Sequence, residues 1–176
     1  MRTAVLDIGG TFIKSGIYGP AGLQQIQETP TPAREGGAAL MECAKQILRG
    51  YTGYDAIGVS TAGQVDVVSG SIRYANENIP GYTGTKVREI LEDAFSVPVV
   101  VDNDVNMAAI GEAYLGAGKD QRDFLCLTYG TGIGGAIVQD RQIFRGSSFS
   151  AAEFGSIVTH GKDQENQGGF PAGIYE

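Results

Sequence analysis

The sequence predicts a mixed α/β protein, and three features of its 176 residues lead to this class. Short apolar runs of strand length recur along the chain. Two pairs of these runs are joined by glycine-rich turns, and later runs alternate with segments that have apolar residues at helical spacing. Successive strands that give way to alternating helices and strands are typical of a mixed sheet covered by helices.

The first part of the chain is predicted to form three strands and a helix. Residues 2–7 and 12–18 are short apolar runs on either side of a glycine pair. The turn formers at 19–22 separate them from a third strand at 23–29. Residues 36–49 carry apolar side chains at helical spacing, which predicts the first helix.

Helices and strands alternate over the following part of the chain. A short apolar strand is expected at 56–60 and a hairpin at 65–75. Amphipathic spacing predicts a helix at 86–95, with the hydroxyl of Thr85 as its cap, and another at 104–115. The remaining strands are expected at 99–101, 124–128 and 136–138.

Composition and charge argue against several classes of function. The net charge of -7 and the pI near 4.7 disfavour nucleic-acid binding, which needs clustered lysine and arginine. The sequence has no apolar stretch near the ~18 residues of a membrane span and no signal-peptide pattern. Cys43 and Cys126 lie in apolar runs without CxxC spacing, which favours buried thiols over a disulfide. We therefore expect a cytoplasmic protein that binds neither nucleic acid nor membrane.

A glycine pair joins the first two predicted strands, in the sequence Asp7-Ile8-Gly9-Gly10-Thr11. Glycine tolerates positive φ and lets an anion approach backbone N–H groups, so this turn suits a phosphate. Asp7, at the end of a strand, would hold a divalent cation directly or through water. A type I′ or II′ hairpin without any ligand explains the same residues equally well.

A second glycine-rich turn, Gly130-Thr131-Gly132-Ile133-Gly134-Gly135, joins two later strands. Four glycines in six residues exceed what a turn requires, and a phosphate-binding turn would explain the excess. The interpretation is stronger for the two turns together, because both lie between two apolar strands.

Carboxylates and amides gather where a predicted strand passes into a helix, at Val101-Asp102-Asn103-Asp104. Such residues either cap the helix or face a cleft, where Asp104 would act as a general base with Asn103 beside it. Asp102 is interpreted as a strand-end residue. The polar loop 76–82 suits hydrogen bonds to hydroxyl groups, although it is equally typical of an ordinary surface loop.

Six motifs occur in a fixed order along the chain: LDIGGT, STAGQVD, NENIPGY, VDNDVNMAAIGE, YGTGIGGA and AAEFGS. With these motifs the sequence resembles, over essentially the whole chain, the ROK family of bacterial sugar kinases and sugar-responsive repressors. The resemblance implies the actin-like ATPase (ribonuclease H-like) fold, with a mixed five-stranded sheet and helices, in which two domains close over ATP and a sugar. It implies an N-terminal domain at 1–115 and the incomplete beginning of a second, similar domain at 116–176. The chain is thus similar to an N-terminal portion of a family member, through truncation, proteolysis or a split gene.

Residue by residue, the resemblance assigns the two glycine turns to the phosphates of ATP. The matching positions are Asp7, which would bind Mg²⁺ through water, Gly9, Gly10, Thr11, Lys14, Thr131, Gly132 and Gly134. Asp104 matches the base that takes a proton from the sugar hydroxyl. The sugar-contacting positions are Gly63, Asn78, Asn103, Glu153 and Glu176.

The sequence departs from the family pattern where family members bind zinc. Ser156 stands in place of the usual zinc-binding histidine, and the segment 166–176 has no cysteine. His160 comes too late in the chain to replace that histidine and is expected to be a surface residue. We therefore expect no zinc site, as in a zinc-less branch of the family.

The resemblance implies an ATP-dependent sugar kinase, of the glucokinase or glucoside kinase type, that transfers a phosphoryl group from Mg-ATP to a hexose hydroxyl. The 176-residue chain alone is expected to be inactive. Two alternatives remain: a non-catalytic sugar-sensing module of the same family, and another small-molecule kinase of the actin-like fold. The resemblance also leaves a homodimer open.

Overall fold

The computed structural model describes residues 1–130 and 132–157. The backbone divides into two compact units, Met1–Asp104 and Val105–Glu176, and each is described by itself. This division concerns packing alone, so the predicted domains 1–115 and 116–176 stay a prediction.

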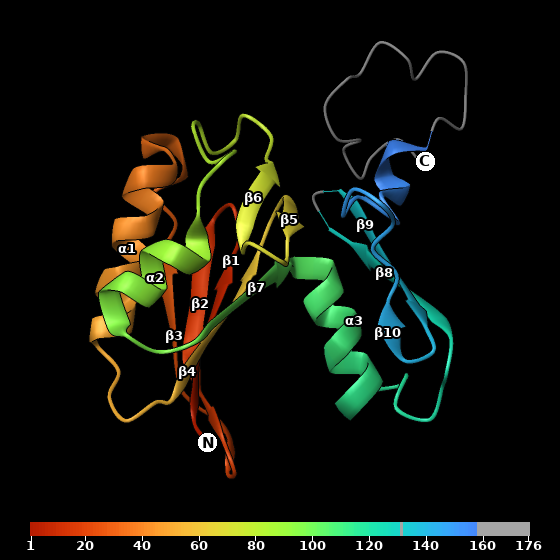
Figure 1. Ribbon diagram of the computed structural model, residues 1–176, viewed down its shortest axis with the longest axis horizontal. Helices are drawn as coiled ribbons and strands as arrows, with labels where there is room; N and C mark the ends of the chain where they lie inside the picture. Colours follow the sequence, from red (N-terminus) through yellow and green to blue (C-terminus); the bar gives the residue numbers. More distant parts are fainter. Residues whose placement is uncertain (131, 158–176) are drawn as a thin grey trace. The chain divides into compact units, whose positions relative to one another are not determined.

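A five-stranded sheet with the strand order β3-β2-β1-β4-β7 forms the centre of the first unit (Figure 1). The pairs β1–β2 and β2–β3 are antiparallel, and the pairs β1–β4 and β4–β7 are parallel. The predicted mixed five-stranded sheet is therefore confirmed. Its strands are β1 (Thr3–Ile8), β2 (Phe12–Gly19), β3 (Gly22–Pro30), β4 (Ala56–Thr61) and β7 (Val99–Asn103).

Two helices, α1 (Gly37–Arg49) and α2 (Val87–Phe95), pack on one face of this sheet, and a short 3₁₀ helix, η1 (Ala33–Glu35), precedes α1. Side chains alternate between the two faces of a strand, so alternate strand residues form the core under the helices. The core residues of β1, β4, α1 and α2 are Ala4, Leu6, Ile8, Ile57, Val59, Leu40, Met41, Ala44, Leu48, Val87 and Leu91. Asp7 and Ser60 consequently face the side of the sheet that these helices do not cover.

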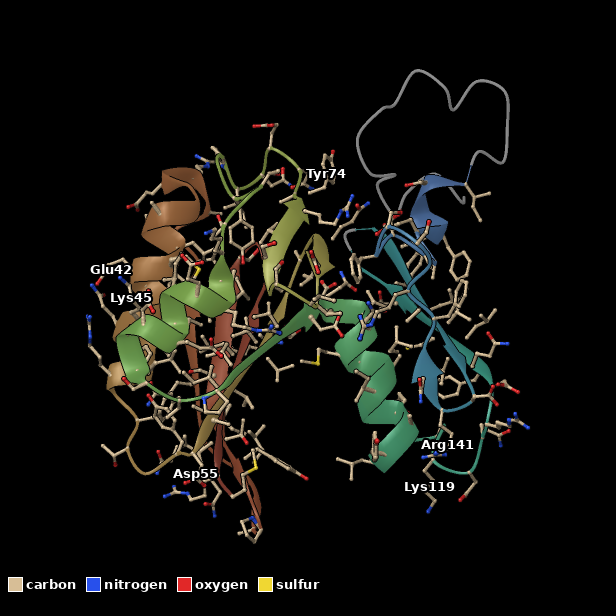
Figure 2. The ribbon with its side chains drawn as sticks, in the orientation of Figure 1. Glu42, Lys45, Asp55, Tyr74, Lys119 and Arg141 are labelled. Carbon is tan, nitrogen blue, oxygen red and sulfur yellow. The ribbon has the colours of Figure 1, made fainter. Side chains whose placement is uncertain are left out.

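The outer face of α1 carries an ion pair between Glu42 and Lys45, 2.6 Å apart (Figure 2). The hydrogen bond from Lys45 lowers the pKa of the Glu42 carboxyl. Both side chains are solvent-accessible, and exposed pairs of this kind contribute little to stability because solvent screens them. The apolar face of the helix therefore determines its position.

The start of α2 differs from the prediction. Lys86 is the N-cap residue and makes no side-chain capping hydrogen bond, so the predicted Thr85 cap is wrong. The backbone of Thr85 is used elsewhere: its N–H donates to the Tyr82 carbonyl (3.0 Å), and its carbonyl accepts from the Ile72 N–H (2.9 Å). These bonds hold Thr85 against the preceding loop and strand.

A hairpin of β5 (Gln64–Asp66) and β6 (Ser71–Tyr74) follows β4 and is fastened by one arginine of α2. Arg88 donates hydrogen bonds to the carbonyls of Val68 (2.7 Å), Val67 (2.9 Å) and Val99 (3.0 Å). A guanidinium presents its donors in a rigid planar fork, so one side chain can link the hairpin turn to β7.

Among the described residues, Tyr82 is the largest fully buried side chain, and it fixes the loop that follows β6. Its hydroxyl lies 2.9 Å from the hydroxyl of Thr61, which is also fully buried at the end of β4. Burial raises the pKa of Tyr82 to about 12, because the ionised phenolate would lose its hydration.

The raised pKa of Tyr82 makes the stability of the protein sensitive to alkali. In the unfolded chain the phenol ionises at its ordinary pKa of 10.0, whereas in the folded chain its pKa is about 12. The stability that the buried, protonated phenol contributes is fully present below the unfolded pKa and is lost as the pH rises through the folded pKa. When the pH is raised from about 9 to about 11.5, we expect the free energy of unfolding to fall by about 2 kcal/mol more in the wild type than in Tyr82→Phe. Denaturant unfolding of both proteins at these two pH values checks this, with Tyr74→Phe as the exposed control. Equal losses in the wild type and Tyr82→Phe would contradict the prediction.

The second unit consists of α3 and a three-stranded antiparallel sheet with the order β10-β9-β8. Its core contains Val105 and Ala109 of α3 and Ala136 and Val138 of β9, with Cys126 packed against them. Burial raises the pKa of the Cys126 thiol, and Cys126 and Cys43 are both free and half-buried. The elements are α3 (Asp104–Leu115), β8 (Phe124–Tyr129), β9 (Ile133–Gln139), β10 (Gln142–Ile143) and the 3₁₀ helix η2 (Phe154–Ser156). No helix in the described part of the chain has the length and apolar character needed to cross a bilayer.

Candidate functional site

The carboxyl ends of the three parallel strands place a row of polar residues on one edge of the first sheet. Asp7 of β1 is paired in register with Ser60 of β4, and Ser60 with Asp102 of β7. Residues directly opposite in neighbouring strands point to the same face, so these three residues, the polar row, lie side by side. The Ser60 hydroxyl donates a hydrogen bond of 2.9 Å to Oδ1 of Asp7. Asp7 is exposed, whereas Asp102 is 3% exposed.

The first glycine turn continues from Asp7. The Gly9 N–H donates to the Phe12 carbonyl (3.0 Å), and the Thr31 hydroxyl donates to the Gly9 carbonyl (2.7 Å). Neither Gly9 nor Gly10 has a positive φ, so the alternative of a type I′ or II′ hairpin is wrong. A Cβ at Gly10 would meet no atom within 4 Å. The absence of a side chain at Gly10 therefore leaves the backbone of this turn open to a ligand.

Lys14 lies on β2 opposite Asp7, and on its other side it is opposite Glu28 of β3. The side chain of Lys14 is exposed on the sheet face that carries the polar row. A cation at this place is suited to an anionic ligand bound over the glycine turn.

Asn103 links Asp104 to the loop after β4. Its Nδ2 donates to the Gly63 carbonyl (3.0 Å) and to Oδ1 of Asp104 (2.9 Å). Its backbone N–H donates to Oδ1 of Asp102 (2.8 Å). The structure thus brings together three of the predicted site residues, Gly63, Asn103 and Asp104.

Gly63 occupies a backbone position that requires glycine. Its φ is +97°, and a Cβ built there would lie 2.7 Å from the carbonyl oxygen of Tyr74, which is labelled at the end of β6 in Figure 2. Only glycine adopts this conformation without strain. The tight turn aims the Gly63 carbonyl at Asn103, so the residue shapes the site through its backbone.

The loop between β6 and α2 carries Asn78, whose side chain is exposed. The Asn78 N–H donates to Oδ1 of Asn76 (3.2 Å), while Ile79 and Tyr82 are buried beneath the loop. The Pro80 carbonyl accepts from the Gly37 N–H at the start of α1 (2.9 Å). The loop is therefore anchored at its C-terminal half and presents Asn78 to solvent.

The second glycine turn lies in the second unit. The Gly130 N–H donates to the Gly132 carbonyl (3.0 Å), and Thr131 lies outside the described residues. Gly134 is a residue of β9, where a Cβ would lie 2.5 Å from a methyl group of Val105. A Cβ at Gly135 would overlap the ring of Phe154. Close packing thus accounts for two of the four glycines, and phosphate binding at this turn stays a prediction.

The other predicted sugar-contacting residues belong to the second half of the chain. Glu153 precedes η2 and has an exposed side chain. Glu176 and His160 lie outside the described residues. Glu153 belongs to the second unit, whereas Gly63, Asn103 and Asp104 belong to the first, so a shared site of these four residues stays a prediction.

The donor atoms of the polar row fit a magnesium ion that is shared with phosphate groups. Mg²⁺ is usually held by one or two carboxylates together with substrate phosphates and water. Within residues 1–130 and 132–157, no three His, Cys, Asp or Glu side chains gather as a metal site. The single exposed carboxylate of Asp7 is suited to the shared arrangement and not to an all-protein cage.

Sequence reasoning missed two residues that organise this site, Ser60 and Tyr82. Ser60 has a signal in the sequence, because a polar side chain ends the apolar run of β4. Tyr82 was part of the polar loop, and its burial beside Thr61 had no signal in the sequence.

Comparison with known proteins gives consistent matches over nearly the whole chain. A family model described as "ROK family" matches residues 3–172. An uncharacterised protein of Clostridium perfringens is 45% identical over 90% of this chain and 55% of its own length. A beta-glucoside kinase of Listeria monocytogenes is 35% identical over 99% of this chain and 58% of its own length.

The first unit and the following strands also resemble solved structures. The crystal structure of a glucokinase from Streptomyces griseus, in complex with glucose and AMPPNP, has a TM-score of 0.81 and 32% identity to this chain. The match covers 91% of this chain and 51% of that structure. The chain thus spans about half the length of the relatives that it matches.

Proposed function

This chain belongs to the ROK family, and on that premise we propose that the whole protein is an ATP-dependent sugar kinase of the glucokinase or glucoside kinase type. The chain has the actin-like ATPase fold that the sequence resemblance implied. The related beta-glucoside kinase and the glucose-bound glucokinase support a hexose or a β-glucoside as the phosphoryl acceptor.

The bridge formed by Asn103 is the observation that carries this proposal. Its amide donates both to the Gly63 carbonyl and to Oδ1 of Asp104, so the carboxylate is held in a defined orientation. A general base must lie within hydrogen-bond reach of the proton that it removes, and a fixed orientation favours this geometry. A solvated helix cap would not need the second anchor at Gly63.

In the proposed reaction, Asp104 accepts the proton of one sugar hydroxyl. The hydroxyl oxygen then bonds to the γ-phosphorus of ATP, and the bond from that phosphorus to the β-phosphate oxygen breaks, so ADP leaves with the electron pair. Mg²⁺, when bound, offsets the negative charge of the phosphates, and Asp7 would hold it through water. The residues proposed to contact the phosphates are Gly9, Gly10, Thr11, Lys14, Thr131, Gly132 and Gly134, and those proposed to contact the sugar are Gly63, Asn78, Asn103, Glu153 and Glu176.

A coupled ADP-release assay on the full-length gene product tests the proposed function. Mg-ATP is offered with a panel of hexoses and β-glucosides, and acetate and glycerol serve as acceptors for other small-molecule kinases. Turnover with a sugar supports the proposal. Turnover with acetate alone, or sugar binding without any ADP release, would assign the protein to one of the two alternative classes.

The expected lack of zinc stays a prediction, because His160 and the segment after it lie outside the described residues. Ser156, at the position of the family's histidine, has an exposed hydroxyl, and a neutral hydroxyl is a poor ligand for Zn²⁺. We expect elemental analysis of the purified full-length protein to find less than stoichiometric zinc. One zinc ion per chain, retained after dialysis against a weak chelator, would contradict this.

Three further expectations from the sequence also stay predictions. They are a cytoplasmic location, the absence of nucleic-acid binding at a net charge of -7, and a homodimer that the resemblance leaves open.

A further inference from the structure

The side chain of Ser60 contacts Asp7 on the sheet face that α1 and α2 do not cover. Along β4, Val59 and Thr61 are buried at 0% exposure, whereas Ser60 points to the other face and is partly exposed. Its hydroxyl is therefore not needed to fill the core. A β-branched apolar residue would suit the strand better on propensity alone.

The register of the parallel strands makes Ser60 the neighbour of two carboxylates, Asp7 on β1 and Asp102 on β7. A serine hydroxyl has one proton to donate. That proton goes to Oδ1 of Asp7, at 2.9 Å, across 53 residues of sequence. Within the described residues Asp7 makes no ion pair with Lys14, although the two are opposite in register.

An exposed aspartate at the end of a strand samples several rotamers, and holding it in one of them has an entropic cost. A hydrogen bond from a side chain on a neighbouring strand supplies part of that ordering before any ligand arrives, because both strands are fixed in the sheet. Oδ2 of Asp7 takes no part in this bond.

We propose that Ser60 is a positioning residue for Asp7, which orders the carboxylate for a Mg²⁺ ion bound together with nucleotide phosphates. This inference rests on the proposed function, since it assumes that Asp7 holds the metal. Ser60 itself is not assigned a contact with substrate or metal.

The test compares Ser60→Ala with the wild type, and Ser60→Thr as the variant that keeps a hydroxyl. Ser71→Ala is the matched control, because Ser71 is also a partly exposed strand serine, and its hydroxyl lies 2.7 Å from that of Ser69, away from Asp7. All four full-length proteins are titrated into Mn²⁺-ADP, and the affinity is measured by electron paramagnetic resonance of Mn²⁺. ADP without metal and the sugar are titrated separately.

We expect Ser60→Ala to weaken the affinity for Mn²⁺-ADP roughly five-fold, less than the full effect of losing one hydrogen bond to a charged group, because this bond orders Asp7 and does not itself contact the metal. The affinities for metal-free ADP and for sugar, and the thermal midpoint, are expected to match the wild type. Ser60→Thr should restore most of the Mn²⁺-ADP affinity, and Ser71→Ala should not change it. In the kinase assay, the Mg²⁺ concentration at half-maximal rate is expected to rise by a similar factor.

Unchanged Mn²⁺-ADP affinity in Ser60→Ala would overturn the inference, as would an equal loss in Ser71→Ala. The failure of the proposed function has a different signature. If the wild type phosphorylates no sugar but Ser60→Ala still weakens Mn²⁺-ADP binding, the positioning role stands and the kinase proposal falls. If the wild type is an active kinase and Ser60→Ala binds Mn²⁺-ADP normally, only the role of Ser60 is wrong.

Discussion

Replacing Asp104 by asparagine is expected to lower kcat of the full-length protein by about 10²–10⁴-fold, the usual contribution of a general base. The substitution removes the proton acceptor but keeps an oxygen at the position of Oδ1. Nδ2 of Asn103 can therefore still donate to that oxygen, as it does to Asp104 at 2.9 Å. The orientation of the side chain should survive, and with it the affinity for sugar.

The measurement is the steady-state rate of ADP release, combined with calorimetric titration of the sugar that gives the highest turnover. Asp93→Asn is the control, because Asp93 is an exposed aspartate on α2 and loses the same charge. A wild-type rate in Asp104→Asn would exclude Asp104 as the base. A loss of sugar affinity equal to the loss of rate would make Asp104 a binding residue.

Replacing Gly63 by alanine is expected to lower kcat/KM for the sugar by about 100-fold, since a displacement of roughly 1 Å in a site costs a factor of this order. A Cβ at this position would lie 2.7 Å from the Tyr74 carbonyl oxygen, which belongs to the backbone and cannot rotate away. The loop must shift, and the Gly63 carbonyl then moves from Nδ2 of Asn103, now 3.0 Å away. Asp104 loses its orientation because Asn103 loses its anchor.

Gly84 provides a matched control for the backbone effect. Its φ is +84°, close to the +97° of Gly63, but a Cβ at Gly84 would meet no atom within 4 Å. Gly84→Ala should therefore have only the conformational cost of about 1–2 kcal/mol in stability, with little change in kcat/KM. If Gly63→Ala and Gly84→Ala lower the thermal midpoint and kcat/KM equally, the close contact with Tyr74 does not determine the site.

Two errors of the sequence interpretation have the same origin. Glycine and threonine were assigned by the turn or cap that these residues usually form, at Gly9-Gly10 and at Thr85. In the folded chain, Thr85 is paired through its backbone with Tyr82 and Ile72, and Gly10 provides open space without positive φ. Local propensity cannot decide between such uses, because the competing partner comes from another part of the chain.

The sequence by itself determined the mixed sheet, the positions of its helices, the family and the pairing of Asn103 with Asp104. The mixed sheet and its helices depend on the periodicity of apolar residues over short segments. The family depends on the order of motifs along the chain, and the pairing of Asn103 with Asp104 depends on two adjacent residues.

Only the tertiary structure decided what these residues contact. The pairing of Ser60 with Asp7, the burial of Tyr82 against Thr61, and the anchoring of Asn103 by Gly63 each join segments far apart in the chain. The packing of Gly134 against Val105 and of Gly135 against Phe154 is decided in the same way. Parallel strands have no connecting turn to set their register, so the neighbours of a side chain follow from how the whole sheet and its helices pack.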